Sequence, residues 1–214
     1  MKLVLHSYWR SSASHRVRIA LGLKHLAYEY VVVNILTGDQ RTDAYRTRNP
    51  LAQVPTLEIT EVDGTIRSVT QSLPILEYLD ERFTEVPILP ADPYLRARAR
   101  SLAEIVNSGI QPLQNLATTT AVKALGGDPA VWVKPFIAAG IAAYAQAMAD
   151  VAGDFSVGDR PSIADCCLVP QLASARRFHV PIESEQLLAI EARCLAIPAF
   201  AKAMPDQQPD AVKS

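Results

Sequence analysis

The first 33 residues alternate between strand and helix patterns. Residues 2–7 form an apolar run, as expected of a strand buried on both faces. Residues 12–25 place apolar side chains on one helical stripe, and residues 28–33 are rich in β-branched and aromatic residues. A strand, a helix and a second strand this close together predict a right-handed crossover, and therefore parallel pairing in one sheet.

The sheet is expected to continue after this crossover. Residues 34–48 are polar and predict a loop with one short helix. Residues 57–60 predict a third strand and residues 65–69 its hairpin partner, because Asp63-Gly64 between them is a turn signal. A helix is then predicted with Ser72 as its N-cap. The resulting order, β-α-β-α-β-β-α, describes a mixed sheet with helices packed on it.

The pattern changes beyond a proline-rich linker. Ala- and Leu-rich segments with helical spacing follow, and they cover residues 95–116, 130–151, 163–178 and 187–203, the last of them interrupted at Pro198. The fold class is therefore α/β plus all-α. We divide the chain into an N-terminal domain over residues 1–84, a linker over 85–93 and a helical domain over 94–214. The polar end, residues 205–214, is expected to be loose.

Composition narrows the class of protein. The 214 residues carry a formal net charge of -1, so the large basic surface that nucleic-acid binding needs is not expected. No apolar run is long enough to cross a bilayer, and the N-terminus does not resemble a signal peptide. We expect a cytoplasmic protein with neither nucleic acid nor membrane as partner. Cys166, Cys167 and Cys194 predict buried, reduced thiols, and the four histidines show no metal-ligand spacing.

The stretch between the first strand and the first helix is the best candidate site. A strand, a short polar turn and a helix start direct backbone N–H groups and a positive helix end at one point, which suits an anion such as a thiolate. Ser11 and Ser12 have two interpretations here: they could cap the helix, or one hydroxyl could donate to a bound thiolate. Arg10 lies at the same turn and is a further anion-binding candidate.

Three other positions allow alternative interpretations. Val54-Pro55 lies between a loop and a strand, where a cis bond would turn the Val54 backbone outward to receive an extended peptide. Arg176 and Arg177 end an Ala-rich helix, so they could bind an anion or only stabilise the helix dipole. Ser162 and Asp165 fit the S-x-x-D pattern of a helix N-terminal box, so Asp165 is predicted to stabilise the fold.

Along nearly its whole length the sequence resembles the zeta class of glutathione transferases, which includes maleylacetoacetate and maleylpyruvate isomerases. The most specific match is WRSSASHRVRIAL, which is similar to the family's S-S-C-x-x-R-V-R-I-A-L signature. Further matches follow in the family's order and spacing, namely Asn49-Pro50 with Gln53-Val54-Pro55, Gln71-Ser72-Leu73, the segment from Gly109 to Leu116, and Val157-Gly158-Asp159 through Ala164-Asp165 with Leu168-Val169-Pro170-Gln171.

The resemblance implies a thioredoxin-like N-terminal domain, a helical glutathione-transferase C-terminal domain, a homodimer and a role in aromatic amino acid catabolism. It also implies a glutathione cofactor, bound at positions that match the family's. These are Ser11, Ser12, Ala13, Ser14, His15, Arg16, Gln40, Val54, Pro55, Gln71, Ser72, Gln111 and Asn115. Ser11, Ser12 and Arg10 would be catalytic. Arg10, Arg176 and Arg177 would hold the carboxylates of a small dicarboxylate substrate.

Two departures from the family pattern affect the expected chemistry. Ala13 stands where the signature usually has cysteine, which excludes a cysteine nucleophile at this position, so the reacting sulfur would be that of glutathione. His15 stands where many members have tryptophan and resembles the maleylpyruvate-isomerase branch. The resemblance therefore implies cis–trans isomerisation of a maleyl keto acid. One alternative is conjugation of glutathione to small electrophiles such as α-halo acids, and another is glutathione binding without catalysis.

Overall fold

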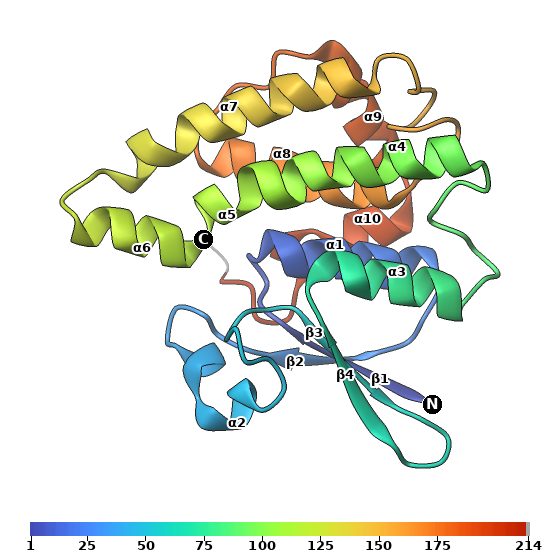
Figure 1. Cartoon of the computed structure of the whole chain (residues 1–214), viewed down its shortest axis with the longest axis vertical. Coiled ribbons are helices and arrows are strands. Elements are labelled where there is room, and N and C mark those ends of the chain that lie inside the picture. The colour runs from blue at the N-terminus through green and yellow to red at the C-terminus, as the bar shows by residue number, and fades with distance from the viewer. Residues whose placement is uncertain (213–214) are drawn as a thin grey trace. The chain divides into compact units, whose positions relative to one another are not determined.

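The computed structural model describes residues 1–212, which fall into two compact units. The first unit contains Met1–Pro87 together with the C-terminal residues from Ile197 onward, and the second contains Ile88–Ala196. Strands occur only in the first unit among the described residues (Figure 1). The prediction of an α/β unit followed by helices is confirmed.

The sheet of the first unit has four strands, β1 (Lys2–Ser7), β2 (Glu29–Val32), β3 (Thr56–Thr60) and β4 (Ile66–Thr70). Their spatial order is β2-β1-β3-β4. The predicted parallel pairing of β1 with β2 is confirmed, and β3 pairs antiparallel with both β1 and β4. The mixed sheet and the hairpin are therefore as the sequence predicts.

Two helices cover one face of this sheet, α1 (Ser12–Leu23) and α3 (Ser72–Arg82) (Figure 1). Both helices and the two central strands contribute fully buried apolar side chains, namely Val17, Ile19 and Leu21 from α1, Ile75, Leu76 and Leu79 from α3, Leu5 from β1 and Leu57 from β3. The loop after β2 contains a 3-10 turn, η1 (Asp39–Arg41), and a single turn of helix, α2 (Asp43–Arg46). This core fixes where the ends of the strands and helices lie.

A helix from the C-terminal part of the chain also belongs to the first unit. Helix α10 (Pro198–Ala203) packs on α1, where a Cβ at Gly22 would come within 3.1 Å of the Ala199 Cβ. The buried Arg18 guanidinium donates two hydrogen bonds, of 3.1 and 3.0 Å, to the carbonyl of Ala203. The sequence-based division placed this segment in the helical domain, because these long-range contacts leave no local pattern.

The prediction of a loose C-terminal segment is wrong for residues 205–212. The segment begins with a 3-10 turn, η3 (Pro205–Gln207). The Asp210 carboxylate then accepts hydrogen bonds from the Trp9 amide at 3.0 Å and the Tyr30 hydroxyl at 2.8 Å. Its partners lie about 200 positions earlier in the chain, so composition alone could not reveal them. Residues 213 and 214 lie outside the described part.

The second unit is helical throughout its regular structure. Its elements are α4 (Pro93–Glu104), a π-helical turn η2 (Ile105–Ile110), α5 (Gln111–Gln114), α6 (Leu116–Ala124), α7 (Pro129–Met148), α8 (Ile163–Arg177) and α9 (Glu185–Leu195). The helical character predicted for residues 95–116 is confirmed, but the region is divided into α4, η2 and α5 and ends before α6. Pro112 lacks an N–H to continue the helical ladder, and Asn115 adopts an extended conformation and caps α6. No described helix is both long and apolar enough to cross a membrane.

The predicted box at the start of α8 is confirmed. The fully buried Asp165 carboxylate accepts hydrogen bonds from the amides of Ser156 at 2.9 Å and Ser162 at 2.8 Å. The Ser162 hydroxyl in turn accepts the Ala164 amide at 3.2 Å. Burial raises the pKa of Asp165, while these hydrogen bonds oppose the shift. The three cysteines are free and buried, as predicted.

Candidate active site

The strand register brings three separate stretches of the chain to one end of the sheet. Thr56, the first residue of β3, pairs with both His6 and Thr70, which lie near the C-terminal ends of β1 and β4. The segments that adjoin these residues carry most of the site residues predicted for the first unit, namely Ser11 to Arg16, Val54-Pro55 and Gln71-Ser72. The sheet therefore places the candidate glutathione-binding segments of this unit together.

The N-terminus of α1 supplies hydroxyl and amide donors at this edge. Ser11 is the N-cap, as one of its two interpretations required, and its Oγ accepts the Ser14 amide at 3.2 Å. The cap uses a lone pair of this oxygen and leaves the hydroxyl proton available. Ser12 is the first helical residue, and its hydroxyl bonds to nothing within residues 1–212. Ala13 is partly exposed on the same turn.

The N-terminus of α3 differs from the prediction. Ser72 is not the N-cap but the first helical residue, and its hydroxyl accepts a hydrogen bond of 3.0 Å from Nη1 of the buried Arg16. The cap position belongs to Gln71, whose φ of 68° lies in the left-handed region. Such a conformation is costly for a non-glycine residue and is concentrated at functional sites. Arg16 thus connects the starts of α1 and α3.

The Val54-Pro55 segment exposes backbone groups at the same edge. The Val54-Pro55 bond is cis, as the resemblance implied. The Val54 N–H and C=O form no hydrogen bond with any described residue. Val54 is only partly buried, so these two groups can pair with the backbone of an extended peptide.

Two buried side chains hold the carbonyl just before Val54. The Gln53 carbonyl accepts hydrogen bonds from the Tyr45 hydroxyl at 2.7 Å and from Asn49 Nδ2 at 2.8 Å. The Gln53 side chain accepts another from Gln71 Nε2 at 3.2 Å, which links two of the site segments. Sequence reasoning missed Tyr45 altogether and used Asn49 only as part of a motif, since neither contact has a local signal.

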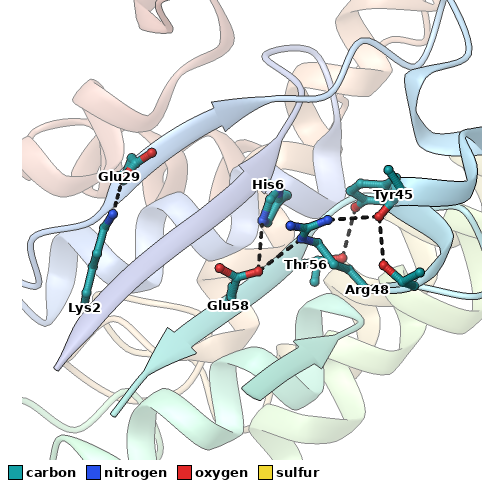
Figure 2. Close-up of polar contacts among 9 residues, drawn as sticks. Lys2, His6, Glu29, Tyr45, Arg48, Thr56 and Glu58 are labelled. Carbon is teal, nitrogen blue, oxygen red and sulfur yellow. Dashed lines mark hydrogen bonds and ion pairs between the residues drawn. The ribbon is translucent and has the colours of Figure 1, made fainter. Parts of the chain in front are cut away.

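Tyr45 lies beside three titratable residues, His6 on β1, Glu58 on β3 and Arg48 in the loop after α2 (Figure 2). The His6 ring meets the Tyr45 ring edge-on, with centroids 6.0 Å apart, and His6 Nε2 lies 3.8 Å from Glu58 Oε2. Arg48 Nε donates to the same Glu58 oxygen at 3.1 Å. Burial lowers the pKa of His6, and the nearby Arg48 lowers it further. The Lys2–Glu29 pair at 2.6 Å is separate and exposed.

His15 and Gln40, both predicted to contact glutathione, are buried within the first unit. Burial lowers the pKa of His15 well below its usual value, with Arg18 and Arg16 adding to the effect, so the ring is neutral at pH 7. Its Nε2 has no hydrogen-bond partner among residues 1–212. Gln40 Nε2 donates to the Ile35 carbonyl at 3.3 Å. The contacts of both side chains with glutathione stay predictions.

Arg10 is an exposed cation on the turn that precedes α1. Its guanidinium carbon lies 5.6 Å from the centre of the Trp9 ring, a cation–π contact that leaves the N–H groups open to an anion. The backbone around it is well held, because Asp210 accepts the Trp9 amide and Arg18 Nη2 donates to the Trp9 carbonyl at 3.1 Å. Arg10 therefore extends from a fixed turn.

The other predicted site residues lie in the second unit. Gln111 begins α5, and the Asn115 side chain accepts the Ala117 amide at 3.1 Å. A buried amide pair holds this region to α8, because Gln114 Nε2 donates to Gln171 Oε1 at 2.8 Å. The roles of Gln111 and Asn115 in glutathione binding stay predictions.

The arginine pair at the end of α8 is already engaged in contacts. Arg176 forms a two-pronged ion pair with the buried Glu191, with Nη1 and Oε1 separated by 2.6 Å. This pairing raises the pKa of Arg176. The Arg177 guanidinium lies 4.7 Å from the centre of the Phe178 ring. Substrate binding by this pair stays a prediction. In the part of the chain that is described, no three His, Cys, Asp or Glu side chains are arranged to hold a metal ion.

Comparison with known proteins decides the family. The N-terminal domain of glutathione S-transferases matches residues 10–82. The maleylacetoacetate isomerase of Dictyostelium discoideum is 42% identical over 98% of this chain and 96% of its own length. The chain belongs to the zeta class of glutathione transferases. The predicted family is thereby confirmed, and with it a thioredoxin-like fold followed by a helical domain, enzymatic activity and glutathione as the family's cofactor.

Solved structures of other zeta-class enzymes resemble this one closely. Maleylacetoacetate isomerase from Anaeromyxobacter dehalogenans has been crystallised with glutathione, and also with dicarboxyethyl glutathione and citrate, in its active site. The glutathione complex is 48% identical, has a TM-score of 0.91 and covers 99% of this chain and 98% of its own. A holo maleylpyruvate isomerase is 38% identical with a TM-score of 0.90, and covers 98% of this chain and 100% of its own. Both substrate branches of the class are thus represented.

Proposed function

We propose that the protein is a glutathione-dependent cis–trans isomerase of maleyl keto acids. It would convert maleylacetoacetate to fumarylacetoacetate, or maleylpyruvate to fumarylpyruvate. The observation that carries the proposal is the unpartnered Val54 backbone beside the N-termini of α1 and α3. This combination suits a peptide with an anionic sulfur, and the zeta-class isomerases crystallised with glutathione support it.

The donor set of the first unit fits glutathione. Val54 offers one N–H and one C=O, which matches the two backbone groups of a central peptide residue. Gln71 and Ser72 stand at the start of α3, where a helix N-terminus favours the carboxylate of the γ-glutamyl end. The strained φ of Gln71 is consistent with a side chain and amide that are needed for binding.

Bound glutathione supplies a thiolate that adds reversibly to the cis double bond of the substrate, so that the bond can rotate before the thiolate leaves. The chain's own contribution is electrostatic. The Ser11 hydroxyl donates to the anionic sulfur while its oxygen stays fixed by the Ser14 amide, and the end of α1 adds its positive potential. Donors that are oriented before the reaction need no reorganisation when charge develops.

Substrate carboxylates would be held by arginine. Arg10 is exposed on the turn that leads to Ser11, so an anion that it binds lies next to the sulfur site. Arginine binds a carboxylate through two parallel N–H groups, which fixes orientation as well as position. We assign Arg10 to the substrate carboxylate nearer the reacting double bond. Binding of a carboxylate by Arg176 or Arg177, which belong to the second unit, stays a separate prediction.

Replacing Arg10 with alanine is expected to raise the KM for the maleyl substrate by about tenfold or more, because a charge-assisted carboxylate contact is lost. Steady-state kinetics with saturating glutathione would measure this. Arg82→Ala is the matched control, since Arg82 is also exposed and stacks on its neighbour Phe83 at 5.7 Å, at the other end of α3 from Ser72. An equal rise in KM for both variants would contradict the assignment.

Glutathione transfer to α-halo acids is the second candidate function. The same thiolate site serves it, and only one carboxylate needs to be held. The engagement of Arg176 with Glu191 favours this alternative, because that arginine is not free without breaking an ion pair. Parallel assays of maleylacetoacetate, maleylpyruvate and an α-halo acid would separate the candidates. Glutathione is recovered unchanged in isomerisation and consumed in conjugation. We also expect a homodimer, which light scattering of the purified protein would test.

A further inference from the structure

We infer that Tyr45 is a positioning residue for glutathione: its hydroxyl, together with the Asn49 amide, holds the Gln53 carbonyl and thereby orients the Val54 N–H toward the peptide. The inference rests on the proposed function. It concerns residues of the first unit alone.

The geometry of the Gln53–Val54 peptide bond determines the direction of the Val54 N–H. The Gln53–Val54 bond is trans, so the Gln53 C=O and the Val54 N–H point in opposite directions within one rigid plane. Two donors, the Tyr45 hydroxyl at 2.7 Å and Asn49 Nδ2 at 2.8 Å, fix the carbonyl oxygen. The Val54 N–H is therefore held away from the protein interior, with no acceptor in residues 1–212.

The Tyr45 side chain is itself held in place on several sides. Its side chain comes from the short helix α2 and is 6% exposed, and its hydroxyl also lies 3.0 Å from Thr56 Oγ1. The His6 ring packs edge-on against it (Figure 2). Burial raises the pKa of Tyr45, so the phenol keeps its proton and remains a donor at neutral pH. Tyr45 can thus fix the Gln53 carbonyl without being displaced by solvent.

Tyr45 should act on the tripeptide backbone of glutathione and not on its sulfur. The sulfur site belongs to Ser11 and the end of α1, which the Gln53 carbonyl does not contact. Loss of the Tyr45 hydroxyl should therefore weaken binding of the tripeptide backbone and leave the reactivity of the bound thiol unchanged. A general loss of stability would instead affect both.

The test compares Tyr45→Phe with the wild type by calorimetric titration of glutathione and by steady-state kinetics. We expect the Kd and the KM for glutathione to rise about five- to tenfold, which corresponds to one lost hydrogen bond. The kcat at saturating glutathione and the pKa of the bound thiol should not change. A glutathione Kd equal to that of the wild type, or a changed thiol pKa, would overturn the inference.

Two control variants separate positioning from general damage. Thr56→Val removes the other partner of the Tyr45 hydroxyl and keeps the contact with Gln53, so its glutathione KM should stay near that of the wild type. Tyr144→Phe removes a buried hydroxyl that bonds to Ser156 at 2.9 Å in the second unit, and should lower stability alone. A KM effect as large in either control as in Tyr45→Phe would contradict the inference. A wild type that binds no glutathione would instead contradict the proposed function.

Discussion

Ser11→Ala should lower kcat/KM by about 10²-fold or more, both for maleyl isomerisation and for conjugation of α-halo acids, because one preorganised donor to an anion is lost. The same change should raise the pKa of the bound glutathione thiol, since the thiolate loses a hydrogen bond. Steady-state kinetics and a titration of the thiolate's ultraviolet absorbance would measure the two effects.

The control for Ser11→Ala is another serine N-cap. Ser184 caps α9 and accepts the Leu187 amide at 3.3 Å, three positions on, just as Ser11 accepts Ser14 at 3.2 Å. Both alanine variants should lose about 1 kcal/mol of unfolding free energy, which is the usual cost of a lost cap. Only the Ser11 variant should lose activity. Equal activity losses would mean that Ser11 acts only through the stability of a helix.

Asp165→Ala should have the largest effect on stability, with a loss of about 3–5 kcal/mol in the free energy of unfolding. It removes the acceptor of the amides of Ser156 and Ser162, and leaves both donors buried. Denaturant unfolding, followed by circular dichroism, would measure the change. The activity of the protein that remains folded at low temperature should be largely retained.

Two variants would show that the buried hydrogen bonds, rather than helix capping alone, cause this loss. Asp165→Asn keeps an oxygen acceptor and should lose less stability than the alanine variant. Asp92 caps α4 at an exposed site, accepting the Leu95 amide at 2.8 Å, so Asp92→Ala should cost only about 1 kcal/mol. Similar losses in Asp92→Ala and Asp165→Ala would contradict the account.

Local patterns in the sequence were sufficient to predict most of the strands and helices of the first unit. The apolar run of β1, the β-branched β2 and the Asp63-Gly64 turn each determine their own element, and the crossover rule then fixes the parallel pairing. The position of the sulfur site follows from the same order, because the strand–turn–helix sequence itself creates the helix end at Ser11.

The features that the sequence did not predict correctly, or did not predict at all, depend on contacts between residues that are distant in sequence. Ser72 has the chemistry of an N-cap, but Arg16, 56 positions earlier, uses its hydroxyl. The C-terminal segment has a composition typical of loops, but Asp210 is held by Trp9. The part played by Tyr45 depends on a backbone carbonyl eight positions away in a folded loop, which no periodicity indicates. Such contacts depend on the tertiary structure and leave no repeating pattern.

Isomerase activity can be followed directly by proton NMR of maleylacetoacetate and of maleylpyruvate, each mixed with the purified protein and a trace of glutathione. We expect complete conversion of at least one acid to its trans isomer. Glutathione should remain at its starting concentration, and no conversion should occur when it is omitted. Conversion that does not depend on glutathione, or no conversion of either acid while the protein binds glutathione, would contradict the proposed function.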